Sequence, residues 1–264
     1  MLQKRYEGFL NTPFIWQNNA VFNLTQFNIE TLATKVDFQI DEKLRLGKYI
    51  ERLVSFELSQ HQNISILAEN IQVQKDKITL GELDSLLLKD TQPIHLEIIY
   101  KFYLYDAAVG TTEIDHFIGP NRKDSLIEKL VKLKDKQLPL LHFDACKPYL
   151  EALGLNAKNI TQQVYFKAQL FLPFTNQNIQ LKELNNECVV GCYITKNELD
   201  HFKDHKFYIP EKKDWLVTPY SNINWVTFES FKTTARNYCS EKYSTLFWIK
   251  FKNGVLKKMF LVWW

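Results

Sequence analysis

The alternation of hydrophobic and polar residues predicts one helix and three strands in the first half of the chain. From residue 41 to about residue 58 the apolar side chains recur at helical spacing and share one face. Three segments with the pattern of strands follow at 64–74, 79–89 and 94–104, separated by polar turns. Residues 1–40 have no regular period, and we expect them to pack as an arm on the remainder.

A second helix is predicted at residues 121–137. Asn121 is placed as its N-cap, and Asp124 stands at the third helical position. The inner face of this helix is apolar and its outer face is rich in lysine. Three leucines make up the inner face: Leu126, Leu130 and Leu133.

Beyond Pro139 the pattern becomes typical of strands. Short alternating segments occur at 166–173, 189–195 and 225–228. Near the end, Asn253-Gly254 separates two apolar, aromatic runs, which predicts a β-hairpin. We expect an N-terminal arm at 1–40, a core at 41–145 and a β-rich region at 146–264. The last region is either a second domain or an elaboration of the core.

Composition and charge restrict the class of protein. The 264 residues are 45% hydrophobic, enough for one large core or two modest ones. A net charge of +3 excludes a polybasic coat for nucleic acid, so any basic surface must be local. No apolar leader and no apolar run long enough to span a membrane is present, and the four cysteines form no CxxC pair. We therefore predict a cytoplasmic protein with reduced thiols and no membrane contact.

Charged residues on two of the predicted strands point to metal chemistry. Glu82 and Asp84 share one strand face, and Glu97 and Lys101 share one face of the next strand. A charge on an otherwise apolar strand costs several kcal/mol unless it is paired or bound to an ion. Carboxylates beside an ammonium suit Mg²⁺ or Mn²⁺, with the lysine orienting or deprotonating a water molecule.

The order of these motifs resembles the PD-(D/E)XK nuclease superfamily, and within it the branch similar to Holliday-junction resolvases. That branch carries L-G-x-x-x-E, I-L-A-x-N, G-E-I-D and V-E-V-K. The corresponding segments here are 46–51, 66–70, 81–84 and 96–99, and thirteen residues separate Asp84 from Glu97, as in the family. The resemblance implies a restriction-endonuclease-like α/β fold, a mixed sheet flanked by helices, followed here by a β-rich C-terminal region.

The position of the lysine departs from that pattern. The superfamily lysine stands two residues after the glutamate, where this chain has Ile99, whereas Lys101 lies two residues further along the same strand face. Either Lys101 acts as a displaced lysine or the site has lost its lysine. Motifs along nearly the whole chain also resemble an uncharacterised bacterial family known only as a domain of unknown function, family 1853. In that family the lysine has the same spacing as Lys101.

The resemblance implies roles for four side chains. Asp84 and Glu97 would hold the metal, with the backbone carbonyl of Ile98 as a further ligand. Lys101 would position or activate water, and Glu51 would bind metal or water from the helix. From the residues alone, Glu51 is equally well explained as a solvated glutamate near the polar face of its helix. Lys101 is equally well explained as an ion-pair partner of Glu97.

Residues 122–136 carry a local excess of three positive charges, which is suited to a nucleic-acid backbone. We predict that Asn121, Arg122 and Lys129 contact substrate, although a basic helix face is more often simply solvated. Resolvase-like relatives are often dimers, so a homodimer is possible. The predicted function is Mg²⁺-dependent hydrolysis of phosphodiester bonds in DNA. The alternative is a catalytically inactive protein of the same fold that binds nucleic acid or a protein partner.

Overall fold

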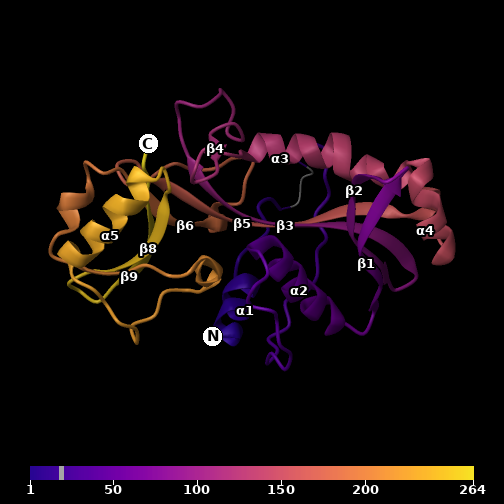
Figure 1. Cartoon of the computed structure of the whole chain (residues 1–264), viewed down its shortest axis with the longest axis horizontal. Helices are drawn as coiled ribbons and strands as arrows, with labels where there is room; N and C mark the ends of the chain where they lie inside the picture. Colours follow the sequence, from indigo (N-terminus) through magenta and orange to yellow (C-terminus); the bar gives the residue numbers. More distant parts are fainter. Residues whose placement is uncertain (18–20) are drawn as a thin grey trace. The chain divides into compact units, whose positions relative to one another are not determined.

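A computed structural model describes residues 1–17 and 21–264 of the chain, and within them five α-helices and nine strands (Figure 1). One π-helical segment and several 3-10 turns connect these elements. The helices are α1 Leu2–Leu10, α2 Leu46–Ser59, α3 Leu126–Lys132, α4 Lys147–Ala152 and α5 Phe228–Ser240. The strands are β1 Ile64–Lys75, β2 Ile78–Lys89, β3 Gln92–Tyr105, β4 Phe117–Ile118, β5 Thr161–Pro173, β6 Val189–Ile194, β7 Lys206–Tyr208, β8 Thr245–Lys250 and β9 Leu256–Leu261.

The strands form one mixed sheet in the order β1-β2-β3-β5-β6-β9-β8-β7, with β4 paired to β3. The pairs β1–β2 and β2–β3 are antiparallel, as are β7–β8 and β8–β9. The pairs β5–β6 and β6–β9 are parallel. The predicted α/β class, a mixed sheet flanked by helices with a strand-rich C-terminal region, is confirmed.

The chain divides into two compact units, each assembled from distant parts of the sequence. Unit 1 consists of Met1–Pro13, Lys101–Ile127 and Ala168–Trp264, and unit 2 consists of Phe14–Tyr100 and Glu128–Lys167. Strands β3 and β5 contribute residues to both units. The expected boundaries of arm, core and C-terminal region stay a prediction.

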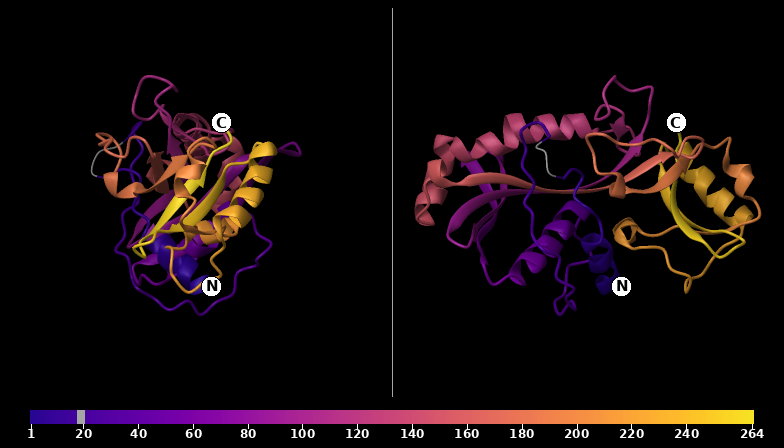
Figure 2. Two further views of the ribbon diagram at one scale, coloured as in Figure 1. Left: turned by 90° about the vertical axis from the view of Figure 1, so that its left-hand side faces the viewer. Right: turned by 180° about the vertical axis from the view of Figure 1, so that it is seen from behind.

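In unit 2, α2 and the helical run from residue 133 to α4 lie on opposite sides of β1 and β2 (Figures 1 and 2). The predicted helix at 41–58 is confirmed, beginning at Leu46, and its apolar stripe is buried. On the other side, Leu83 of β2 packs in a cluster with Leu140 and Leu150 from the helical run. Each side of the strands is thus covered by an amphipathic segment, as burial of apolar surface requires.

The helix predicted at 121–137 begins later, at Leu126. The proposed N-cap is wrong: Asn121 Oδ1 instead accepts a hydrogen bond from the Ser244 amide at 2.7 Å, and Arg122 has a φ of 55°. A left-handed residue directly after the cap position cannot start a helix. The three predicted inner leucines are fully buried, which confirms that face. After Lys132 the helix widens into a π-helical segment, Leu133–Gln137.

The N-terminal segment, whose sequence shows no regular period, contains helix α1 at residues 2–10. Tyr6, Phe9 and Leu10 are buried on one face, but nine residues are too few for a clear period. Gly8 allows a close approach within unit 1, since a Cβ built there would lie 2.1 Å from the carbonyl oxygen of Leu216. A side chain at this position would therefore separate the two segments.

The predicted C-terminal hairpin is confirmed as β8 and β9, and Gly254 supplies the positive φ of its turn. The strand predicted at 225–228 is wrong. Only Val226 bridges Phe207, and Phe228 begins α5, where Thr227 accepts a hydrogen bond from the Ser230 amide. A short apolar run does not distinguish a strand from the start of a buried helix. α5 then packs on the hairpin through aromatic side chains.

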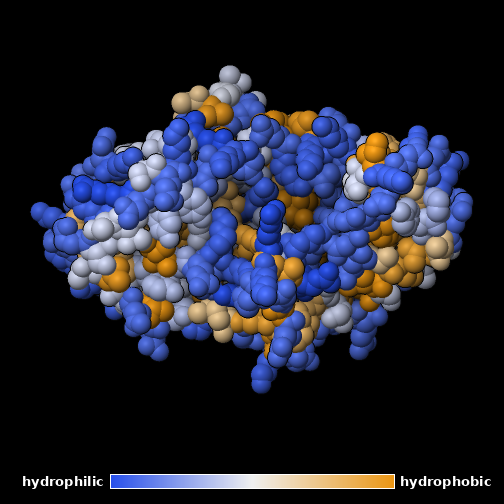
Figure 3. All heavy atoms as spheres, in the orientation of Figure 1, coloured by the Kyte–Doolittle hydropathy of each residue, from blue (hydrophilic) through white to orange (hydrophobic). Residues whose placement is uncertain are grey.

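The described part of the chain contains no helix with the length and hydropathy needed to cross a membrane. All four cysteines are buried and none is in a disulfide. The face drawn in Figure 3 is predominantly hydrophilic, and its hydrophobic side chains form small separate patches.

Candidate metal centre

The candidate site lies in unit 2, where β2 and β3 stop pairing. Their ladder runs from Lys89–Gln92 to Ser85–Leu96 and extends no further. Beyond this point a side chain takes the place of a backbone acceptor: Asp84 Oδ2 accepts a hydrogen bond from the Ile98 amide at 2.9 Å. The divergence of the strands thus makes room for a carboxylate inside the sheet without leaving the amide unpaired.

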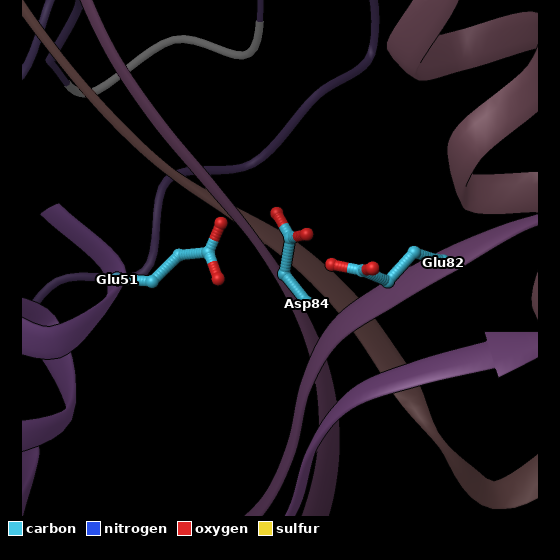
Figure 4. A group of neighbouring side chains, drawn as sticks. All are labelled: Glu51, Glu82 and Asp84. Atoms are coloured by element: carbon cyan, nitrogen blue, oxygen red, sulfur yellow. The ribbon is translucent and has the colours of Figure 1, made fainter. Parts of the chain in front are cut away.

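Three carboxylates converge at this point (Figure 4). One oxygen from each of Glu51, Glu82 and Asp84 lies within 4.8 Å of the others. Helix α2 supplies Glu51, whose carboxylate points towards Asp84 from the side opposite to Glu82. Glu82 and Asp84 are two residues apart on β2, so their side chains leave the strand on the same side. The structure therefore brings the predicted Glu51 and Asp84 together and adds Glu82, which the alternation of β2 had placed on that face.

A lysine that sequence reasoning did not assign to the site contacts these carboxylates. Lys48 Nζ donates to Glu51 Oε2 at 2.9 Å, to Asn70 Oδ1 at 2.5 Å and to Glu82 Oε1. Desolvation lowers the pKa of Lys48, but its bonds to Glu82 and Glu51 outweigh desolvation, so the pKa is raised above its usual range. The signal in the sequence was the three-residue spacing of Lys48 and Glu51, which places both on one helix face.

Asn70 owes its role to an uncommon backbone conformation. Its neighbours on β1 pair with Ser85 and Leu83, so Asn70 stands opposite Asp84, and its φ is 56°. Asparagine tolerates this left-handed conformation better than most residues. Backbone outliers of this kind concentrate at functional sites.

Glu97 is fully buried, and both of its carboxylate oxygens have partners. Oε2 accepts a hydrogen bond from Gln137 Nε2 at 2.5 Å, and Oε1 lies 3.1 Å from His95 Nε2. Gln137 in turn accepts a bond from Lys129 Nζ at 2.7 Å. The predicted substrate contact Lys129 thus lies beside the carboxylates, linked to Glu97 through Gln137.

His95 is held as a neutral ring. Burial lowers the pKa of His95 to about 4, below the range in which it would carry a proton on both nitrogens. Its Nδ1 is 2.9 Å from the amide nitrogen of Gln162, which can only donate. The hydrogen-bond network therefore assigns the ring proton to Nε2, where it is donated to Glu97.

The carboxylates exceed the positive charge available to them. Burial raises the pKa of Asp84 to about 7, and the charge of Glu97 adds to this effect. Burial also raises the pKa of Glu97 to about 7, against the attraction of Lys129. When ionised, four carboxylates (Glu51, Glu82, Asp84 and Glu97) face the ammonium groups of Lys48 and Lys129. The residues therefore fit a divalent cation by both donor type and charge.

The remaining predicted site residues belong to unit 1. Lys101 Nζ pairs with Asp124 Oδ2 at 2.6 Å. Arg122 pairs with Asp106 and lies 4.1 Å above the ring of Trp264, while the side chain of Asn121 bonds the Ser244 amide. These contacts account for the three side chains within unit 1. Their assignment to catalysis or substrate binding stays a prediction.

The chain belongs to the family described as Domain of unknown function (DUF1853), which matches residues 2–258. The predicted membership in that family is confirmed. No curated protein and no solved structure matches the chain.

Proposed function

We propose that this protein is a divalent-metal-dependent nuclease that hydrolyses phosphodiester bonds of DNA, with a core of the PD-(D/E)XK type in unit 2. The proposal rests on one observation. Where β2 separates from β3, Asp84 lies among further carboxylates from α2, β2 and β3, and a lysine contacts two of them. Such a set of groups has little use in a purely structural core, where buried carboxylates are costly.

Asp84, Glu51 and Glu82 are the proposed metal ligands, and Glu97 is the further carboxylate that the superfamily pattern requires. A bound Mg²⁺ or Mn²⁺ would supply positive charge to the phosphoryl oxygens, on which negative charge builds during hydrolysis. The protein's own contribution is to hold the ligands in place. Gln137 and His95 fix the two oxygens of Glu97, and the Ile98 amide fixes Asp84.

Lys48 takes the role that the superfamily gives to the lysine absent at Ile99. Its ammonium is hydrogen-bonded to Glu51 and Glu82, so a water molecule at the carboxylate cluster lies within reach of a positive, proton-donating group. Ile99 is buried and apolar and offers no such group. Lys101, which pairs with Asp124, is the second candidate for this role.

A catalytically inactive binding module is the alternative function. The observation that favours it is again Lys48, because one ammonium already provides hydrogen bonds to two carboxylates and to Asn70. In that case the ammonium would substitute permanently for a metal ion, and the fold would serve only to bind nucleic acid or a protein.

Calorimetric titration with Mg²⁺ and Mn²⁺ separates the two functions. Wild type should bind a divalent ion, and Asp84→Asn should not. Asp144→Asn should bind as wild type does, since Asp144 is exposed and pairs with the neighbouring Lys147 at 2.7 Å. Cleavage of supercoiled, linear, single-stranded and branched DNA should fall about 10²-fold or more in Asp84→Asn. If the wild type binds no divalent ion and cleaves none of the four forms of DNA, the nuclease proposal is wrong and the binding module is the function.

A further inference from the structure

Unit 1 contains a pocket of about 440 Å³ that has no part in the candidate metal centre. It is formed by the end of α1, by β6 and β9, and by the segment that follows Leu216. The lining residues that matter here are Thr12, Gln169, Gly191, Leu216, Lys257 and Lys258. All of them lie in the segments of unit 1.

Lys258 is the unusual member of this lining, being 5% exposed. Its Nζ donates to Gln169 Oε1 at 2.9 Å and to the carbonyl oxygens of Trp215 and Leu216 at 2.6 and 3.4 Å. All three acceptors are uncharged. Among residues 1–17 and 21–264, no carboxylate forms an ion pair with this ammonium.

A buried cation without a counter-charge is unfavourable, because neutral acceptors compensate only part of the lost hydration. Burial accordingly lowers the pKa of Lys258 to about 7. An anion that enters the pocket would supply the missing charge. The hydrogen bond from Lys258 Nζ to the Leu216 carbonyl oxygen is the longest of the three. The ammonium N–H that makes this bond is therefore the one that can turn towards an oxygen of the ligand.

The surroundings of Lys258 favour a negative ligand of modest size. The one carboxylate among the lining residues, Glu187, is exposed. Lys257 directly precedes Lys258 on β9, so its side chain leaves the strand on the opposite face and brings no negative charge to the pocket. Gly191 faces Lys258 across the β6–β9 pair, where a Cβ would lie 2.2 Å from the Lys258 carbonyl oxygen. The glycine thus permits the close strand pairing that holds Lys258 in the pocket wall.

We propose that this pocket binds a small oxyanion, a carboxylate or a phosphate group, which pairs with the ammonium of Lys258. The same chemistry is offered by dicarboxylates and by phosphorylated small molecules. Binding of such a ligand to unit 1 is a second function, independent of the metal chemistry proposed for unit 2.

Calorimetry with succinate and with inorganic phosphate, in chloride of matched ionic strength, tests the proposal and distinguishes the two sources. Wild type should bind at least one of them, and Lys258→Met should weaken that binding tenfold or more. Lys257→Met, which removes a neighbouring exposed lysine, should weaken it less than threefold. Asp84→Asn should bind the anion as wild type does, so failure of the nuclease proposal would not affect this result.

Proton uptake by the wild type supplies a readout that does not depend on the folding of a variant. Succinate binding at pH 8, measured in buffers of different ionisation enthalpy, should take up close to one proton, because pairing returns Lys258 to its charged form. Binding no stronger than that of chloride, binding without proton uptake, or equal affinities of wild type and a folded Lys258→Met would each overturn the proposal.

Discussion

Gln137 Nε2 lies 2.5 Å from Glu97 Oε2 and joins a π-helical turn to a fully buried carboxylate. Lys129 and Gln137 are eight residues apart, a spacing that in a regular α-helix would leave them about 80° apart around the axis. The π-helical turn accommodates one extra residue and brings both to one side. Lys129 can therefore donate to Gln137 at 2.7 Å while Gln137 donates to Glu97. The irregular turn thus positions two polar side chains at the candidate site.

Replacing Gln137 by alanine should lower nuclease activity by about tenfold or more, because Glu97 loses a hydrogen bond that fixes its orientation. The free energy of unfolding should fall by about 1–3 kcal/mol, since the buried carboxylate loses a partner. DNA cleavage rates and urea denaturation measure the two effects. Lys136→Ala, at an exposed position in the same turn, is the control and should change neither. Equal behaviour of the two variants would exclude a positioning role for Gln137.

Lys48→Met should reduce DNA hydrolysis by about 10²–10⁴-fold, the usual contribution of a group that assists proton transfer. Its affinity for Mg²⁺ should rise or stay unchanged, because the ammonium no longer competes for Glu51 and Glu82. Cleavage assays and metal titration of Lys48→Met and Lys101→Met test this. Loss of cleavage in Lys101→Met alone would transfer the role to Lys101.

The hydroxyl of Tyr165 donates to Glu57 Oε2 at 2.5 Å, and both side chains are buried in unit 2. Burial raises the pKa of Glu57, and this bond opposes that shift. Tyr165→Phe should lower the free energy of unfolding by about 1–3 kcal/mol, because a buried carboxylate loses a donor. Urea denaturation is the measurement, with Tyr149→Phe at a partly exposed site as a control that stays within 0.5 kcal/mol or so. An equally small effect of both variants would show that the Tyr165 bond adds little to stability.

Gly8→Ala should destabilise the protein by about 1–3 kcal/mol, because the new Cβ would lie 2.1 Å from a backbone oxygen that has little room to move. Gly47→Ala in helix α2 is the matched change, since a Cβ built at residue 47 meets no described atom within 4 Å beyond the adjacent backbone of its own helix. That substitution should be neutral or stabilise by up to about 1 kcal/mol. Thermal denaturation of both variants measures these changes in stability. If Gly8→Ala leaves the stability unchanged, α1 can shift away from Leu216.

Stability should depend on pH through Lys258. The pKa of Lys258 is lowered to about 7 in the folded protein, from 10.5 for an unperturbed lysine. Between these values the unfolded chain binds more protons, so the free energy of unfolding rises with pH from pH 7 upward. This residue alone should contribute an increase of about 2 kcal/mol between pH 7 and 9. Urea denaturation should show a rise about 2 kcal/mol smaller in Lys258→Met than in wild type, because Lys212, whose pKa burial also lowers to about 7, titrates in both proteins. Parallel slopes of the two proteins would contradict this.

Much of unit 2, together with the C-terminal hairpin of unit 1, was predictable from local pattern. Helix α2 and strands β1–β3 follow the period of their apolar residues, and the β8–β9 turn follows from Asn253-Gly254. The order of the motifs implied that Glu51 and Asp84 lie at one site, and the structure brings these two side chains together. Helix α1 was missed because nine residues are too few to reveal a period, and helix α5 was missed because its first residues continue an apolar run with the pattern of a strand.

The α/β class, the main strands and the carboxylates of the candidate site follow from the amino-acid sequence, since they depend on short-range periodicity and residue chemistry. The contacts of Lys48 with Glu82 and of Gln137 with Glu97 arise only when the chain folds. These pairs are 34 and 40 residues apart, and no local pattern specifies a contact over such separations. They form because α2, the diverging strands and the π-helical turn pack around one core, which makes the buried charges and their partners meet.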